Sequence, residues 1–457
     1  MVAVGRDGDT MRASMARGPH NGRRRILMLV PHEPDADPRI GWVTELCTAV
    51  AETVVLGTTW STEPPTGAHP GDASVECIYI PDFTGTREKA LGLMRKLKQS
   101  SRRQQAVADH SPIHSPAQFD GGASAGRLPV RLARLCSLWL KDWMRIDALY
   151  RRGKEESISP DLIVCHDLPG LVAGVRLKSF WGVPLLYDAH EYWPDADLLQ
   201  EPWVEPLLMR VERRLIGRAD QVVTVSPLLA EHLERVYGVK GVLSVPNAVP
   251  ARLEALPTRT SDGRVRFLLQ GRLMPGRGLE LLLDAWAGMD TSAVLQLRYV
   301  PNEYATRIER DYAELLESGR VEKLAAVGEE SLVEAAAEAD VGIVPYPGPS
   351  LNHLYACPNK VSQYMQAGLA LLASSDMLYV DSLLERFGCG LTYDPRQPET
   401  LHAAVDLVVR RPQELARMKK AARTATEKEF NWESVSRPYS DAIERLLGAR
   451  GEAPDDA

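Results

Sequence analysis

Short apolar runs recur along the chain and alternate with stretches in which apolar residues are spaced as on one face of a helix. Continuous apolar strands separated by helices are typical of parallel sheets covered by helices. The pattern predicts an α/β protein with two such sheets. We expect strands at residues 25–30, 53–56, 161–165, 184–187, 220–225 and 242–245 in the first half, and at 265–269, 293–300, 321–325, 341–345 and 369–373 in the second.

A polar segment rich in Pro, Arg and Thr runs to Gly263 and separates the two halves. We expect one domain over residues 25–250 and a second over 264–430, with an amphipathic helix at 431–449 that crosses back onto the first. The polar, Gly/Arg-rich residues 1–24 are expected to form a disordered extension. A mobile insert is expected over about residues 84–127, because its later part is rich in Ser, Pro, Gly and Ala.

The composition is that of a soluble, cytoplasmic protein. The 457 residues are 44% hydrophobic and 25% charged, and the net charge of −7 argues against a general nucleic-acid binder. The six cysteines lack Cys-x-x-Cys spacing, which favours reduced thiols over a zinc site or a disulfide framework. We expect no metal and no cofactor.

Residues 128–150 are predicted to form an amphipathic helix with tryptophans on its apolar stripe and basic side chains away from it. Such a helix could lie on the anionic inner face of a membrane, which would make the protein peripheral. It could equally pack its stripe into the first domain and leave the basic face in solvent. We favour the packed helix, since packed helices outnumber interfacial ones among such patterns.

The turn after the strand at 265–269 is suited to binding an anion. It contains Gly271, Arg272, Gly276, Arg277 and Gly278, and it leads into a helix. Backbone N–H groups at a helix N-terminus and guanidinium groups both favour phosphate. A P-loop is not indicated, because Arg-Gly stands where Lys and Ser or Thr are needed, and the Gly-x-Gly-x-x-Gly spacing of a dinucleotide fold is absent.

Two strand ends of the first half carry histidines with carboxylates. His166 and Asp167 follow one strand, and His190 and Glu191 follow the next. The carboxyl ends of parallel strands meet at one edge of the sheet, where these folds bind ligands, so the loop that ends at Arg39 should face the same cleft. In the second half, a helix beginning at Asn359 is expected to direct its N-terminus toward the cleft.

These motifs, in this order, resemble glycosyltransferase family 4. The resemblance rests on residues 37–40, 160–167 and 187–191 in the first half, and on residues 271–278, 358–368 and 389–394 in the second. It implies a retaining enzyme with the GT-B fold, in which two Rossmann-like parallel-sheet domains face a central cleft. It also implies metal-independent transfer of a sugar, of the hexosyltransferase type, from a nucleotide-diphosphate sugar to a hydroxyl acceptor such as a glycan, a glycolipid or a natural product.

The resemblance also assigns roles to individual residues. Arg272 and Arg277 would bind the donor diphosphate, and His190 would lie beside the donor sugar and phosphate. The remaining implied residues are Gly271, Asn359, Lys360, Gln363 and Tyr355 at the donor, and Arg39, His166, Asp167 and Glu191 on the acceptor side.

One departure from the family pattern concerns its acidic pair. Family members usually carry two glutamates eight positions apart, one near the sugar and one on the ribose hydroxyls, where this chain has Tyr355 and Gln363. Gln363 can accept a hydrogen bond from ribose without the assistance of charge. The departure favours one alternative, a noncatalytic sugar-nucleotide-binding or partner-assembly protein. A GT-B sugar-nucleotide epimerase is a further alternative.

Overall fold

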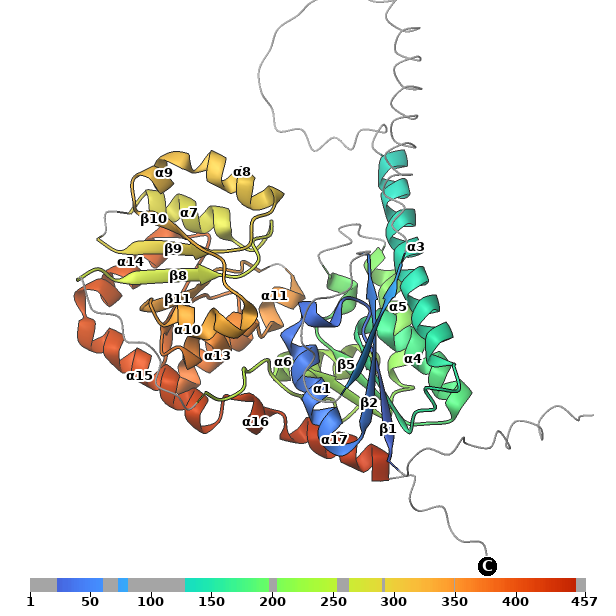
Figure 1. The fold of residues 1–457 in the computed structure, drawn as a ribbon. Coiled ribbons are helices and arrows are strands. Elements are labelled where there is room, and N and C mark those ends of the chain that lie inside the picture. The colour runs from blue at the N-terminus through green and yellow to red at the C-terminus, as the bar shows by residue number, and fades with distance from the viewer. Residues whose placement is uncertain are drawn as a thin grey trace, which may run out of the picture.

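The computed structural model describes residues 23–60, 73–80, 128–196, 204–252, 263–289, 292–348 and 350–448. Most of the expected N-terminal extension and the whole expected insert at 84–127 lie outside these residues. The described chain forms two all-parallel sheets, each flanked by helices (Figure 1). The predicted α/β fold with two parallel-sheet domains is confirmed.

The first sheet has the strand order β3-β2-β1-β4-β5-β6-β7. We call this sheet and the helices that flank it the N-terminal domain. Its strands are β1 (Arg25–Leu29), β2 (Glu52–Thr59), β3 (Ser74–Tyr79), β4 (Leu162–His166), β5 (Leu185–Ala189), β6 (Gln221–Thr224) and β7 (Leu243–Ser244). Its helical elements are η1 (Pro34–Ala36), α1 (Pro38–Val50), α3 (Leu128–Gly153), α4 (Asp167–Trp181), η2 (Trp193–Asp195), α5 (Val204–Ile216) and α6 (Pro227–Tyr237).

The second sheet has the order β10-β9-β8-β11-β12-β13 and defines the C-terminal domain. Its strands are β8 (Arg266–Gln270), β9 (Val294–Arg298), β10 (Val321–Leu324), β11 (Val341–Val344), β12 (Ala370–Ser374) and β13 (Gly390–Tyr393). Its helical elements are α7 (Leu279–Ala287), α8 (Glu303–Asp311), α9 (Ala313–Glu317), η4 (Glu329–Ser331), α10 (Leu332–Ala336), α11 (Leu351–Tyr355), α12 (Asn359–Gln366), α13 (Leu378–Phe387), α14 (Pro398–Arg410) and α15 (Pro412–Lys428).

Both sheets reverse their strand order next to their first strand, between β1 and β4 and between β8 and β11. Ligands of doubly wound sheets bind outside the carboxyl ends of the strands at such a switch point. The loops that follow β1 and β4, and those that follow β8 and β11, are therefore the segments from which a site should be built.

Some elements differ from those that the sequence pattern predicts. For residues 304–318 the spacing of apolar residues predicts a single helix, but the structure has two, α8 and α9, because the chain leaves helical geometry at Tyr312 (φ −119°, ψ 29°). For the connection after β11 the sequence predicts a long loop, and the structure places the short helix α11 within it. Strands β3 and β13 were not predicted from the pattern, since β3 lacks a continuous apolar run and Thr392 interrupts the apolar residues of β13.

The C-terminal end of the chain returns to the N-terminal domain. After α15 the chain passes through α16 (Trp432–Val435) and α17 (Arg437–Gly448), which run beneath both domains and end beside α1 and β1 (Figure 1). Trp432 packs against Trp42 of α1, with ring centroids 5.4 Å apart. The same core cluster contains Tyr439 and Ile443 together with Ile26 and Met28 of β1, so one face of the first sheet is covered by chain from the opposite terminus.

Within the described ranges, no helix is both long and apolar enough to cross a bilayer. Helix α3 packs Ile146 and Tyr150 against the N-terminal core but leaves Leu140 and Trp143 exposed. Binding of this helix to a membrane surface, the less favoured alternative, stays untested.

The turn between β8 and α7 depends on glycine at its last position. Gly278 has φ +78°, in the left-handed region, and a Cβ built on it would lie 2.0 Å from the carbonyl oxygen of Pro345. Gly276 in the same turn has φ +82°, but a Cβ there would meet nothing within 4 Å. Gly278 thus lets the turn approach the backbone that follows β11.

These two glycines provide a matched pair of substitutions. Gly276→Ala should lower the free energy of unfolding by about 1 kcal/mol, the cost of a left-handed alanine. Gly278→Ala adds a clash with Pro345 and should lower it by roughly 3 kcal/mol or more. Denaturant unfolding of both variants measures the difference, and equal losses would show that the contact with Pro345 does not constrain the turn.

Candidate active site

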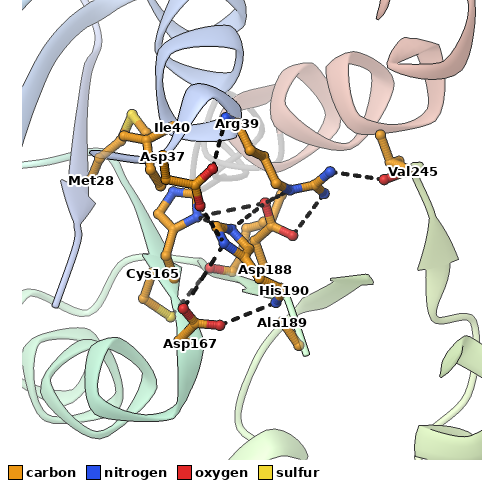
Figure 2. A network of polar contacts seen from close by, with 12 residues as sticks. Met28, Asp37, Arg39, Ile40, Cys165, Asp167, Asp188, Ala189, His190 and Val245 are labelled. Carbon is orange, nitrogen blue, oxygen red and sulfur yellow. Dashed lines mark hydrogen bonds and ion pairs between the residues drawn. The ribbon is translucent and has the colours of Figure 1, made fainter. Parts of the chain in front are cut away.

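The carboxyl ends of β1, β4 and β5 bring together two histidines, three aspartates and an arginine (Figure 2). Asp37 caps helix α1, and its side chain accepts a hydrogen bond of 3.0 Å from the backbone N–H of Arg39. Asp167 begins α4 with φ +55°, a conformation that is rare for residues other than glycine and is often found at functional sites.

The centre of this cluster is a buried ion pair between Arg39 and Asp188. Arg39 donates from Nε and Nη2 to the two oxygens of Asp188, at 3.0 and 2.9 Å, and both side chains are fully buried. Nη1 donates to the carbonyl of Val245 and to Asn247 Oδ1. Burial opposes ionisation of Asp188, but Arg39 outweighs it and, with His190, holds the pKa of this carboxyl well below its usual range.

This geometry changes the role expected for Arg39. The guanidinium is 0% exposed and its bonds are directed to the protein itself, so it cannot contact an acceptor. Its function is to hold Asp188 in place.

His190 lies among three carboxylates. Its Nδ1 is 3.0 Å from Asp37 Oδ2 and 3.9 Å from Asp167 Oδ2, and its Nε2 is 3.6 Å from Asp188 Oδ2. Burial opposes the charged ring, but these carboxylates prevail and raise the pKa of His190 well above its ordinary value. These carboxylates favour the imidazolium form of His190, whose side chain remains 13% exposed.

His166 is the neutral partner of His190. Its Nδ1 is 3.0 Å from His190 Nε2, and burial lowers its pKa to about 3. When His166 is neutral, its Nδ1 can accept a hydrogen bond from the Nε2–H group of His190. Like Arg39, His166 is 0% exposed, so it supports His190 from within the protein and does not face an acceptor.

His166, Asp188 and His190 also have the spacing of metal ligands, with ligand atoms all within 4.8 Å of one another. Those same atoms are bonded to one another and to Arg39. A cation there would have to compete with the charges of Arg39 and of protonated His190.

On the C-terminal domain, two cations converge beside the glycine turn. Arg277 donates to the hydroxyl of Tyr346 (3.4 Å), and its guanidinium carbon and Lys360 Nζ lie 5.3 and 5.2 Å from the centre of that ring. Burial raises the pKa of Tyr346, but Lys360 and Arg277 outweigh it and lower the pKa. Lys360 Nζ also lies 4.0 Å from the point where a Cβ on Gly271 would be.

Two polar atoms at this cluster have no hydrogen-bond partner among the described residues. They are Nε of Arg277 and Oδ1 of Asn359, both buried, and Asn359 is the first residue of α12. Arg272 is exposed on the same turn. The unpaired N–H of Arg277 and two cations at a glycine turn, beside the first turn of a helix, are the features of an anion-binding site.

The two residues at the positions of the family's acidic pair lie apart. Tyr355 packs against His232 of the N-terminal domain, with ring centroids 5.7 Å apart. Gln363 is 5% exposed and donates to Glu329 Oε1 at 2.9 Å. Sequence analysis missed Tyr346 and Glu329, which come from connections after β11 and β10 that carry no motif of their own.

The two domains touch next to His190. The backbone N–H of Tyr192 donates to Asn352 Oδ1, whose Nδ2 donates back to the carbonyl of Tyr192. Ser350 donates to Asp195 at 2.9 Å. The segment that contains α11 thus joins the N-terminal domain two residues after His190. Glu191, predicted on the acceptor side, lies in the same stretch and is half-buried.

Comparisons with known proteins agree with this architecture. Sucrose-phosphate synthase from Thermosynechococcus elongatus is 16% identical, with a TM-score of 0.66 over 93% of this chain and all of its own. HepE of Anabaena, solved in complex with UDP, is 14% identical, with a TM-score of 0.59 over 92% of this chain and all of its own. At such identities the likeness shows the fold alone, which is the GT-B fold of glycosyltransferases.

Sequence comparison narrows this class. Residues 84–248 match the model of the glycosyl transferase 4-like domain. The MMP alpha-(1->4)-mannosyltransferase of Mycolicibacterium hassiacum is 24% identical over 304 residues, which are 63% of this chain and 72% of the relative. Both matches are to glycosyltransferases of the family 4 type, so the predicted resemblance to that family is supported.

Removing one member of the buried ion pair should cost much more than removing a surface pair. Asp188→Asn leaves the Arg39 guanidinium buried without a counter-charge, and we expect the free energy of unfolding to fall by about 3–5 kcal/mol. Asp406→Asn breaks the exposed pair with Arg410 and should cost less than about 1 kcal/mol. Denaturant unfolding compares them, and similar losses would contradict the importance given to Arg39.

The lowered pKa of His166 predicts a loss of stability in acid. Between pH 6.5 and 3 the unfolded chain binds a proton at this residue that the folded protein does not, so stability falls by up to ~1.4 kcal/mol per pH unit. The raised pKa of His190 acts in the other direction, because its contribution is complete below pH 6.5 and is lost as the pH rises through its folded value. It does not vary in the acid window.

His166→Asn removes the titration of His166. The stability of the wild type relative to this variant should therefore fall by about 2–3 kcal/mol between pH 7 and 4.5. Unfolding in denaturant at the two pH values measures this change, and a constant difference would show that His166 is not held neutral.

Proposed function

We propose that this protein transfers a sugar, with retention of anomeric configuration, from a nucleotide-diphosphate sugar to a hydroxyl acceptor. The observation that carries the proposal is the convergence of Arg277 and Lys360 beside the Gly271 turn. Two cations at a glycine turn match the two negative charges of a diphosphate. The turn lies at the switch point of the second sheet, where such folds bind ligands.

His190 supplies the opposing side of the proposed reaction centre. It is a partly exposed imidazolium held by Asp37 and Asp167, and it follows β5 at the switch-point edge of the first sheet. A cation in this place can donate a hydrogen bond to an oxygen of the donor sugar or phosphate and fix its position. His166 and the Arg39–Asp188 pair hold the ring from behind.

In the proposed reaction the acceptor oxygen forms a bond to the anomeric carbon on the face from which the diphosphate departs. The bond from that carbon to the phosphate oxygen breaks, its electron pair leaves with the diphosphate, and the proton of the acceptor hydroxyl passes to the departing phosphate oxygen. Arg272, Arg277 and Lys360 would stabilise the growing negative charge more in the transition state than in the ground state. These cations are the basis for proposing transfer that needs no metal.

The relatives support the class of donor. HepE binds UDP, and a further structure of it contains UDP-glucose, while the mycobacterial relative transfers mannose. A hexose linked to a nucleoside diphosphate is therefore the donor class that we propose for this chain.

The replacement of the acidic pair by Tyr355 and Gln363 favours one competing function, noncatalytic binding of a nucleotide sugar. Tyr355 packs against His232 and supplies no carboxylate to the donor sugar. Incubation with nucleotide sugars and a panel of hydroxyl acceptors, followed by mass spectrometry, separates the two functions. Transferred sugar supports the enzyme, and binding without any turnover supports the binding protein. Conversion of the donor in the absence of an acceptor would indicate an epimerase.

The diphosphate site is tested by replacing its two turn arginines. UDP, GDP and ADP are each added to the protein, and the one that raises its melting temperature most is used as the probe. Arg272→Ala combined with Arg277→Ala should abolish that rise, because the cations that bind the phosphates are lost. Circular dichroism should show an unchanged fold.

A control variant combines Arg410→Ala with Arg417→Ala, which removes two exposed arginines from α14 and α15. Its melting temperature should rise with the nucleotide as the wild type does. An undiminished rise in the variant of the turn would place the diphosphate elsewhere.

A further inference from the structure

Four side chains behind the Gly271 turn form an unbroken series of hydrogen bonds. Arg298 Nη1 donates to Gln270 Oε1 (3.2 Å), Gln270 Nε2 donates to Gln363 Oε1 (3.4 Å), and Gln363 Nε2 donates to Glu329 Oε1 (2.9 Å). Each glutamine accepts with its oxygen and donates with its nitrogen, so all the bonds run in one direction. The series begins at a cation and ends at a carboxylate.

The two ends differ in exposure. Arg298, Gln270 and Gln363 are 5%, 1% and 5% exposed, whereas Glu329 is exposed. The bonds at both ends of the Gln363 amide fix its orientation. Gln363 is thus a buried connector, and the carboxylate that reaches solvent in front of it belongs to Glu329, 34 positions earlier in the chain.

This series adjoins the proposed diphosphate site. Gln270 is the residue before Gly271, whose backbone N–H donates to the carbonyl of Arg298 at 2.9 Å. Desolvation raises the pKa of Glu329, and the negative charge of Asp37, on the N-terminal domain, raises it further. Glu329 therefore lies on the side of the C-terminal domain that is turned toward Asp37.

We infer that Glu329 binds the ribose hydroxyls of the nucleotide donor, with Arg298, Gln270 and Gln363 as positioning residues. The inference rests on the proposed function, which places a nucleoside diphosphate at this turn. Gln363 engages Oε1 of Glu329, and Oε2 has no hydrogen-bond partner within the part of the chain that the structure describes. An ionised carboxylate accepts hydrogen bonds through both oxygens. The two neighbouring ribose hydroxyls can each donate one, so the carboxylate matches the pair of hydroxyls.

Glu329 thus supplies from η4 the charge that the family pattern places on α12. A neutral Gln363 is needed for this arrangement, because a glutamate there would repel Glu329 and could not donate to it. With glutamine at position 363, the carboxylate that binds ribose comes from Glu329 of η4 and the site still contains one.

The experiment measures how strongly each variant distinguishes a ribonucleotide from one without ribose hydroxyls. Titration calorimetry gives Kd for UDP, GDP and ADP, and then for the 2′,3′-dideoxy form of the tightest of the three. The wild type should bind the ribonucleotide about tenfold more tightly or better, the usual effect of a charge-assisted hydrogen bond. In Glu329→Gln this ratio should fall to near one, while binding of the dideoxy form stays unchanged.

Two further variants sharpen the result. Glu330→Gln neutralises the adjacent carboxylate, which is not bonded to Gln363, and should keep the wild-type ratio. Glu329→Gln combined with Gln363→Glu exchanges the two side chains, and it should not recover discrimination, because the carboxylate then lies at the buried position 363 and an amide faces the ribose.

The outcomes separate the inference from the function on which it rests. If none of the three diphosphates binds the wild type, the proposed function fails and the inference fails with it. If the wild type binds and Glu329→Gln keeps the wild-type ratio, the inference alone is overturned. An equal loss for the ribo and dideoxy forms would also overturn it, since that pattern reports general damage to the site.

Discussion

The ion pair between Arg39 and Asp188 connects four parts of the chain that are remote in sequence. Arg39 comes from α1 and Asp188 from β5, and the same guanidinium binds the segment that follows β7 at Val245 and Asn247. The ring of Trp432 lies 6.0 Å from the guanidinium carbon, so the C-terminal segment covers the pair. Burying two charges is costly unless every hydrogen bond is made, and here the protein supplies them. The position of His190 depends on this arrangement through Asp188.

The two halves of the site differ in the charges that surround their central side chains, His190 and Tyr346. On the N-terminal domain, three aspartates keep His190 charged although it is largely buried. On the C-terminal domain, Arg277 and Lys360 lie together against one tyrosine and lower its pKa, an arrangement that a bound anion would stabilise. The proposed diphosphate sugar would supply that anion and present its oxygens to His190.

The sequence predicts most of the sheets, because continuous apolar strands are recognisable without any knowledge of their partners. It does not predict β3, where Glu76 and Cys77 interrupt the apolar pattern, or the break at Tyr312, which no proline or glycine marks. The strand ends at His166 and His190 could be found because chain order places them at one edge. The burial of Arg39 could not, since it depends on Val245 and Trp432, which are contacts between distant segments. The same holds for Glu329, whose partner is known only once β8 and α12 are packed.

The return of the last helices to the first sheet has a consequence for how the protein is made. Ile26 and Met28 belong to the first strand, yet the core that buries them is completed by Tyr439 and Ile443. Domains usually fold as units during synthesis, with the N-terminal one first. Here α1 covers only part of one apolar face of the first sheet, and the rest stays uncovered until almost the whole chain has emerged from the ribosome. The face of the first sheet is fully covered only after α17 has been synthesised. A chain that stops before α17 leaves Ile26 and Met28 partly uncovered.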